Sequence, residues 1–175
     1  MFEGCLNLIS TPKLPLATLA NSCYKNMFKN CELITNTLEK LPASVLSDYC
    51  YYGMFEGCKS LTQAPELLGD SLKPSCYERM FYNCENLNFI KLYAKNIDAD
   101  NSLRDWTYNV SQTGTFIKYP TTTIETGVDG IPENWEITED STMVNMVITN
   151  TSAEPLTIEL ITNNVSRVLE GRVLN

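Results

Sequence analysis

Seven cysteines are the residues whose spacing could do chemistry here, as disulfides, zinc ligands or reactive thiols. Six of them bracket three copies of one motif, C-Y-x-x-M-F-x-x-C, at residues 23–31, 50–58 and 76–84, and residues 1–5 repeat its second half. No two cysteines are separated by only two residues, so the spacing does not predict a zinc site. The odd number of cysteines follows from the sequence starting halfway through a motif.

The cysteine positions also argue against disulfides, if the motif is helical. Two residues eight apart on a helix are separated by about 12 Å along its axis, whereas a disulfide needs Cα atoms within roughly 7 Å. Neighbouring helices pack at roughly 8–10 Å, which also exceeds that reach. A disulfide staple between neighbouring repeats is the alternative. We therefore predict free, buried thiols in two ladders, Cys5, Cys31, Cys58 and Cys84, and Cys23, Cys50 and Cys76.

The composition excludes several classes of function. Histidine is absent, which removes Ser-His and Cys-His nucleophile pairs, and no cofactor motif stands out. With no such group in place, we expect no enzyme activity. The net charge of −8 disfavours nucleic-acid binding, which needs clustered Lys and Arg. No apolar run approaches about 18 residues, so no membrane span is expected.

The elements that carry the cysteines repeat at a fixed step. The methionines of the motif stand at Met1, Met27, Met54 and Met80, separated by 26, 27 and 26 residues, and such a step is typical of repeat proteins. Apolar residues at steps of three and four across residues 16–28 predict one helix per repeat. A short extended piece then follows, with an apolar residue three positions past the last cysteine of each motif: Leu8, Ile34, Leu61 and Leu87.

One helix and one short strand per repeat, with leucines at fixed places, predicts a leucine-rich-repeat solenoid of the α/β repeat class. We assign residues 1–94 to this solenoid and residues 95–140, where the period is lost, to an irregular C-terminal cap. A solenoid end exposes apolar surface, so the cap is expected to cover the last repeat. The residues expected to do so are Phe116, Ile131 and Trp135.

Residues 141–175 are assigned to a short all-β segment. "MVNMVITN" and "LTIELITNN" are β-rich and separated by "TSAEP", which is typical of a hairpin. The segment resembles the opening strands of an Ig-like sandwich. The alternative is an edge module that pairs with another chain.

The repeats resemble those of the BspA-like leucine-rich-repeat surface proteins of anaerobic bacteria, in the branch with 26-residue repeats. The resemblance rests on the unit "MFEGCKSLTQAPELLGDSLKPSCYERMFYNC" and on the closing stretches "LNFIKLYAKNIDADNSLRDW", "GTFIKYP" and "GIPENWEI". It covers roughly residues 1–138, and it departs from the family pattern at "PELLGDSLKPS". The motif is specific for the family and uninformative about activity.

The resemblance implies a non-enzymatic recognition or adhesion module of a bacterial surface or secreted protein, which binds a protein or a glycan. Its implied location is extracellular or at the cell surface. The alternative is a phage structural or host-attachment protein of the virion. Because the sequence opens inside a repeat, we expect either a longer array upstream or a first half-repeat that docks onto another chain.

The expected binding surface is the outer face of the strands. If Leu8 and Ser10 face inward, strand alternation turns Ile9 and Thr11 outward. Four strands at about 4.8 Å spacing span only ~15 Å, which is small for a protein interface. The stacked repeats would then present two exposed ladders, Ile9, Thr35, Thr62 and Asn88, and Thr11, Thr37, Ala64 and Ile90.

Overall fold

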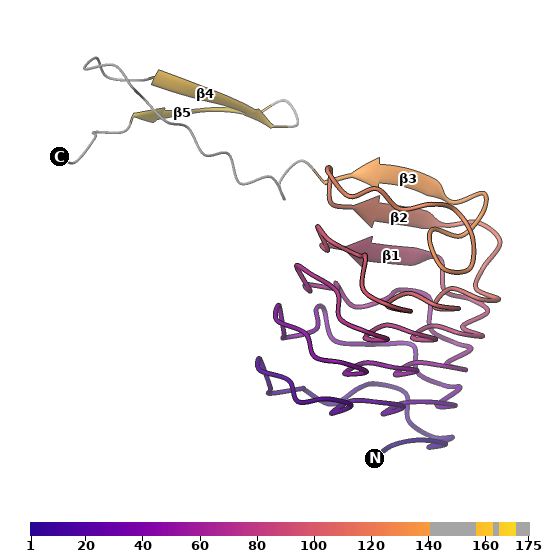
Figure 1. The fold of residues 1–175 in the computed structure, drawn as a ribbon. Coiled ribbons are helices and arrows are strands. Elements are labelled where there is room, and N and C mark those ends of the chain that lie inside the picture. The colour runs from indigo at the N-terminus through magenta and orange to yellow at the C-terminus, as the bar shows by residue number, and fades with distance from the viewer. Residues whose placement is uncertain (141–156, 163–164, 171–175) are drawn as a thin grey trace.

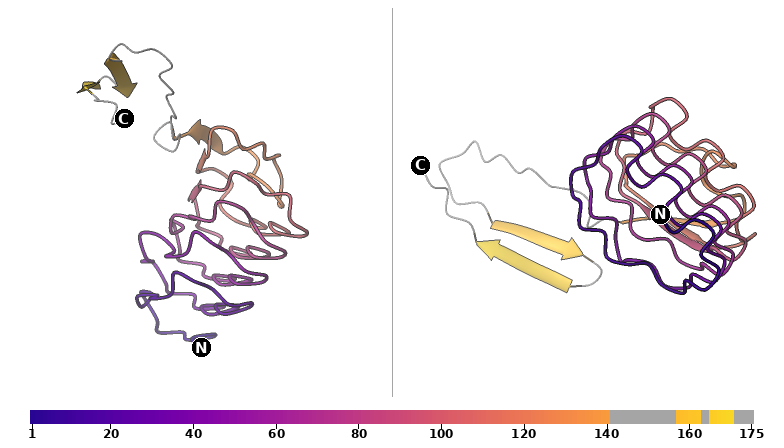
Figure 2. Two further views of the ribbon diagram at one scale, coloured as in Figure 1. Left: turned by 60° about the vertical axis from the view of Figure 1, so that its left-hand side comes forward. Right: turned by 90° about the horizontal axis from the view of Figure 1, so that it is seen from below.

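The computed structural model describes residues 1–140 in full and, beyond them, the backbone of residues 157–162 and 165–170. Residues 1–140 wind into coils that stack one upon the next (Figure 1). Seen along the stack, the coils superpose (Figure 2). We number them from the cysteine at which each begins: coil 1, residues 5–30; coil 2, residues 31–57; coil 3, residues 58–83; and coil 4, residues 84–109.

One side of the stack carries parallel strands. β1 (Phe89–Leu92), β2 (Thr115–Lys118) and β3 (Glu136–Glu139) form a sheet in that order. Coils 1 to 3 carry isolated parallel bridges on the same side, among them Ser10 with Asn36 and Gln63 with Phe89. We call this side the strand face.

The predicted α/β leucine-rich-repeat solenoid is wrong. The described residues contain no helix, and residues 1–140 contain only three short parallel strands. Where the sequence predicted a helix across residues 16–28, the backbone makes a succession of turns. Accordingly, no helix in the described part of the chain is long and apolar enough to cross a bilayer.

These turns form a ribbon in each coil, at residues 20–30, 47–57, 73–83 and 99–109, which we call the turn ribbon. Every second N–H donates to the carbonyl three residues earlier, as from Met27 to Tyr24 (3.2 Å). In coils 1 to 3 the intervening N–H groups donate to the next coil, as from Tyr24 to Cys50 (2.9 Å) and from Phe28 to Met54 (2.9 Å). Alternate donors thus close the turns and join the coils, which satisfies the backbone without a helix.

The turn ribbon needs a left-handed residue every four positions. In coil 1 these are Ser22, Asn26 and Asn30, with φ of 59°, 55° and 59°. Each is the third residue of a turn, the position at which a type II turn requires positive φ. Gly and Asn adopt this conformation most readily. Stacking aligns these residues in three columns: Ser22, Tyr49, Ser75 and Asn101; Asn26, Gly53, Arg79 and Asp105; and Gly4, Asn30, Gly57, Asn83 and Asn109.

The core consists of ladders of like side chains from successive coils. The Phe28 ring stacks between Phe2 and Phe55, with centroids 5.7 and 5.5 Å away. A second ladder places Tyr51 between Tyr24 and Tyr77, at 5.7 and 6.0 Å. Ring separations of this size are those of favourable offset stacking. Repetition of the motif therefore produces a continuous aromatic core.

Phe116, Ile131 and Trp135 are buried in the same core, as expected of residues that cover the repeats. The turn ribbon continues through Asn109, inside the stretch assigned to the cap. The domain boundaries at residues 94 and 140 stay a prediction. β4 (Thr157–Thr162) pairs antiparallel with β5 (Val165–Glu170), whereas the strand predicted at "MVNMVITN" lies outside the described residues.

Candidate functional site

The strand face bears the first predicted ladder as expected: Ile9, Thr35, Thr62 and Asn88 are all exposed. The second ladder is not an exposed one. Ala64 and Ile90 are only 4% and 0% exposed, and Thr11 and Thr37 are half-buried. Whether any of these residues binds a ligand stays a prediction.

The second predicted ladder is not exposed, because the side chains that face outward lie one position earlier in each coil. In β1, Ile90 and Leu92 are buried, whereas Phe89 and Lys91 are half-buried on the opposite side. Phe89 bridges Gln63, and Ser10 bridges Asn36 in the same column. A shift of one residue exchanges the two faces of a strand. The expectation that Ser10 faces inward is therefore wrong, and the column of Ser10, Asn36, Gln63 and Phe89 was missed.

A groove of about 440 Å³ crosses the strand face. Its walls come from coils 2, 3 and 4 and from β2, and they include Thr35, Thr37 and Ala64 of the predicted ladders. The rest of the lining combines apolar groups with amides and charges: Asn36, Leu38, Glu39, Gln63, Glu66, Phe89, Lys91 and Ile117.

The groove lies where the pairing of neighbouring coils is interrupted. Coils 1 and 2 are joined through Asn36, whose carbonyl accepts from Thr11 (3.1 Å), and coils 3 and 4 through the Ala64 N–H, which donates to Phe89 (3.0 Å). Between residues 33–38 of coil 2 and 61–65 of coil 3, both within the described chain, there is no backbone hydrogen bond. Pairing resumes only at Glu66, whose N–H donates to Glu39 (2.9 Å).

The interruption has its origin in the sequence. Coil 2 has 27 residues where its neighbours have 26. Leu38 and Glu39 stand where coils 1 and 3 have a single proline, Pro12 or Pro65. The extra residue puts this stretch out of register with coil 3, in the same way that a bulge locally ends strand pairing. The groove thus lies at the place where coil 2 carries its extra residue.

The one cation of the groove lining is already engaged. The ammonium of Lys91 lies 2.7 Å from Asp140 and 3.4 Å from Glu66, and 5.0 Å from the centre of the Tyr93 ring. Burial lowers the pKa of Lys91, but its hydrogen bonds to Asp140 and Tyr93 and the nearby charge of Glu66 together outweigh burial and leave the pKa above the ordinary lysine value. Lys91 therefore stays charged and paired.

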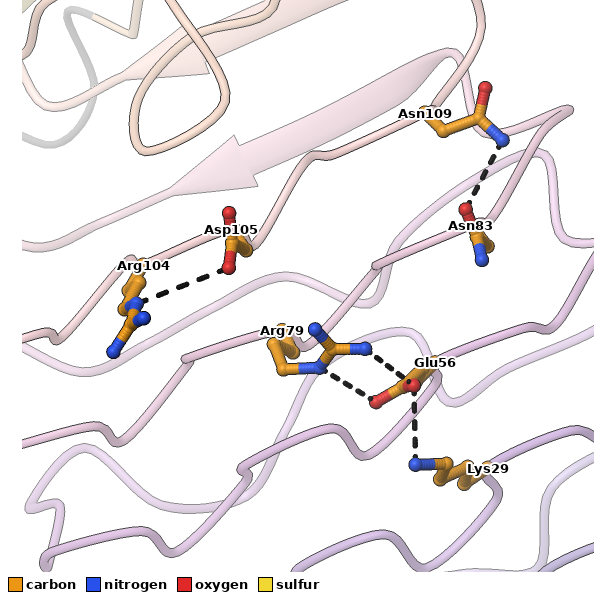
Figure 3. A network of polar contacts seen from close by, with 7 residues as sticks. All are labelled: Lys29, Glu56, Arg79, Asn83, Arg104, Asp105 and Asn109. Atoms are coloured by element: carbon orange, nitrogen blue, oxygen red, sulfur yellow. Dashed lines mark hydrogen bonds and ion pairs between the residues drawn. The ribbon is translucent and has the colours of Figure 1, made fainter.

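A second polar cluster lies on the turn ribbon (Figure 3). The buried carboxylate of Glu56 lies 3.1 Å from Lys29 of coil 1 and 2.9 Å from Arg79 of coil 3. Farther along the stack, the Asn109 amide donates to the Asn83 amide oxygen (3.2 Å). Because these contacts link successive coils, we interpret the cluster as a structural brace.

A larger cleft of about 560 Å³ lies between residues 107–112 and 127–134. Beneath it the indole N–H of Trp135 donates to the Ser111 carbonyl (2.8 Å). Two neighbouring segments form this cleft, whereas the strand-face groove crosses four, so that groove is the better candidate for a ligand that extends along the repeats.

The cysteines are all free, and their placement corrects one expectation. Cys5 and Cys23 are exposed, and the other five are buried. Cys5 and Cys23 are the first residues of the two predicted cysteine ladders. The prediction that both ladders are buried is therefore wrong at these two positions. Burial raises the pKa of Cys50 to about 11, and the pKa of Cys58 and Cys76 to about 12. In the described part of the chain, no group of three His, Cys, Asp or Glu side chains could hold a metal ion.

Comparison of the sequence with protein-family models, curated proteins and solved structures gives no significant match. The resemblance to BspA-like surface proteins is therefore a prediction that these comparisons do not test.

Proposed function

We propose that this protein is a non-enzymatic recognition module that binds a protein or a glycan in the strand-face groove. One observation carries the proposal: a groove crosses neighbouring coils at the place where coil 2 has one extra residue. Its lining places apolar groups beside neutral amides and hydroxyls, as ligand-binding clefts do. The resemblance to bacterial surface proteins supports an extracellular or cell-surface setting.

The groove lining supports binding more than catalysis. Its charged side chains are Glu39, Glu66 and Lys91, and Lys91 is paired with Glu66 and Asp140. The one cation of the lining is thus held in ion pairs, and the other groups that line the groove are mainly amides, hydroxyls and apolar side chains.

The proposal is tested by screening the full chain against glycan and protein arrays in parallel with Gln63→Arg. Gln63 is exposed in the groove, so the arginine side chain would obstruct a ligand without disturbing the core. Ser10→Arg is the matched control, since Ser10 lies in the same column outside the groove. We expect Gln63→Arg alone to lose binding. Equal binding by both variants would place the site elsewhere, and hydrolysis of an arrayed glycan would contradict a non-enzymatic role.

A further inference from the structure

We propose that the ligand of the strand-face groove is a neutral oligosaccharide that lies across the break between coils 2 and 3. This inference rests on the proposed function and names its ligand class. Three features of the groove support it: the break in pairing, the amides without protein partners beside the break and the charge of the lining.

The break leaves polar groups without protein partners. The side-chain amides of Asn36 and Gln63 lie in the groove from either side of it, and both are exposed. In the part of the chain that the structure describes, neither amide makes a hydrogen bond to another protein group. An amide has both donors and an acceptor, so each can bind a hydroxyl in either direction.

The remaining lining fits a sugar ring. The hydroxyl of Thr35 stands beside the amides, and the half-buried Phe89 and Ile117 supply apolar surface. A sugar presents hydroxyls at its edge and C–H groups on its face, which suits amides beside apolar and aromatic groups. Coils 2, 3 and 4 and β2, at about 4.8 Å spacing, span roughly 14 Å, so the groove accommodates a short oligosaccharide.

The charges select a neutral ligand over an acidic one. Lys91, the one cation of the lining, is paired with Glu66 and Asp140. Glu39 adds an exposed carboxylate, and the whole chain carries a net charge of −8. An acidic sugar would meet carboxylates without a free cation, which costs free energy.

The test is calorimetric titration of the full chain with oligosaccharides of one length, neutral in one set and containing uronic or sialic acid in the other. We expect the neutral set to bind and the acidic set to bind at least about tenfold more weakly. Asn36→Ala and Gln63→Ala should each weaken binding roughly three- to tenfold, which is the worth of one hydrogen bond. Ser10→Ala, in the same column outside the groove, should leave binding unchanged.

A second variant tests the break. Replacing Leu38 and Glu39 by one proline gives coil 2 the length and the proline of coils 1 and 3. The pairing should then close and binding be lost, with circular dichroism and thermal unfolding as checks of the fold. If this variant does not fold, binding by Asn36→Ala and Gln63→Ala decides whether the groove holds the sugar.

The outcomes separate this inference from the proposed function. Preference for acidic sugars, or a groove-dependent protein ligand with no neutral sugar bound, would overturn the inference and leave the binding role intact. If wild type, Asn36→Ala and Gln63→Ala bound neutral sugars equally well, the groove would not be the binding site. Absence of binding to any arrayed glycan or protein would overturn both.

Discussion

The guanidinium of Arg79 holds the carboxylate of Glu56, in the preceding coil, through two hydrogen bonds. Arg79 Nε donates to Oε2 (3.2 Å) and Nη2 donates to Oε1 (2.9 Å) (Figure 3). Lys29 approaches the same carboxylate from coil 1 at 3.1 Å. Burial alone would raise the pKa of Glu56, but the hydrogen bonds from Arg79 and Lys29 lower it below its ordinary value of 4.5. One carboxylate thus joins three coils.

Glu56→Gln should lower the free energy of unfolding by about 1–3 kcal/mol near neutral pH, because it weakens two charge-assisted contacts. Since the native pKa of Glu56 is depressed, this stabilisation is fully present above the ordinary value of 4.5 and is lost as the pH falls through the native pKa. The difference between wild type and variant should therefore shrink toward zero in acid. Urea unfolding from about pH 7 to pH 3 measures it.

Glu32→Gln is the matched control, since Glu32 pairs with Lys59 of the next coil at 2.8 Å but both side chains are 47% exposed. An exposed pair is worth at most about 1 kcal/mol. A loss for Glu32→Gln as large as that for Glu56→Gln would contradict the role assigned to the buried network.

Gly53→Ala should destabilise the protein more than Gly4→Ala. Both glycines have positive φ, 55° and 71°, so both substitutions incur the strain of a left-handed alanine, about 1–2 kcal/mol. A Cβ at Gly53 would in addition overlap Oδ1 of Asn26 in the neighbouring coil, whereas a Cβ at Gly4 meets nothing within 4 Å. Thermal unfolding of the two variants isolates the contact. Equal losses would show that strain alone determines the cost.

The repeat itself could be predicted from sequence, but its local conformation was mistaken. Turns that repeat every four residues place Tyr24 and Phe28 on one side, and a helix of 3.6 residues per turn gives nearly the same spacing over so short a segment. The decisive signal was the residue before the second cysteine of each motif. It is Gly4, Asn30, Gly57 or Asn83, which are weak helix formers and natural left-handed residues.

The groove was only partly predictable. Thr35, Thr37 and Ala64 line it, but the alternation predicted from the sequence places the second outward column one residue away from Asn36 and Gln63. Strand alternation is reliable when a ladder is regular, whereas coils 1 to 3 pair through isolated bridges. The extra residue of coil 2 was visible in the sequence, and its effect on pairing needed the neighbouring coil in place.

Trp106→Phe should cost about 1–3 kcal/mol of stability. The buried indole N–H of Trp106 donates to the Gly130 carbonyl at 2.8 Å, and removing a buried donor leaves its partner without that bond. Trp135→Phe is the comparison, because its N–H donates to the Ser111 carbonyl at the same distance but at a partly buried site that water can reach. Denaturant unfolding should show the smaller loss for Trp135→Phe. The reverse order would mean that ring packing outweighs the hydrogen bond.

Thiol titration of the native protein should show two cysteines that react quickly and five that react slowly. Cys5 and Cys23 are exposed, whereas Cys50, Cys58 and Cys76 are buried. Burial also raises the pKa of Cys23, but it raises the pKa of the three buried thiols to about 11 or 12 and holds them protonated near about pH 8. The reactive form of a cysteine is the thiolate, so buried thiols react only when the fold opens.

The expected count is therefore two thiols in the native protein and seven after unfolding without reductant. The double variant Cys5→Ser and Cys23→Ser should abolish the fast phase and leave stability within about 0.5 kcal/mol of wild type, since both side chains are exposed. Cys50→Ser should instead lose roughly 1–3 kcal/mol, because it places a hydroxyl in the apolar core. Fewer than seven thiols after unfolding would mean that disulfides form between neighbouring coils, and the picture of free thiol ladders would be wrong.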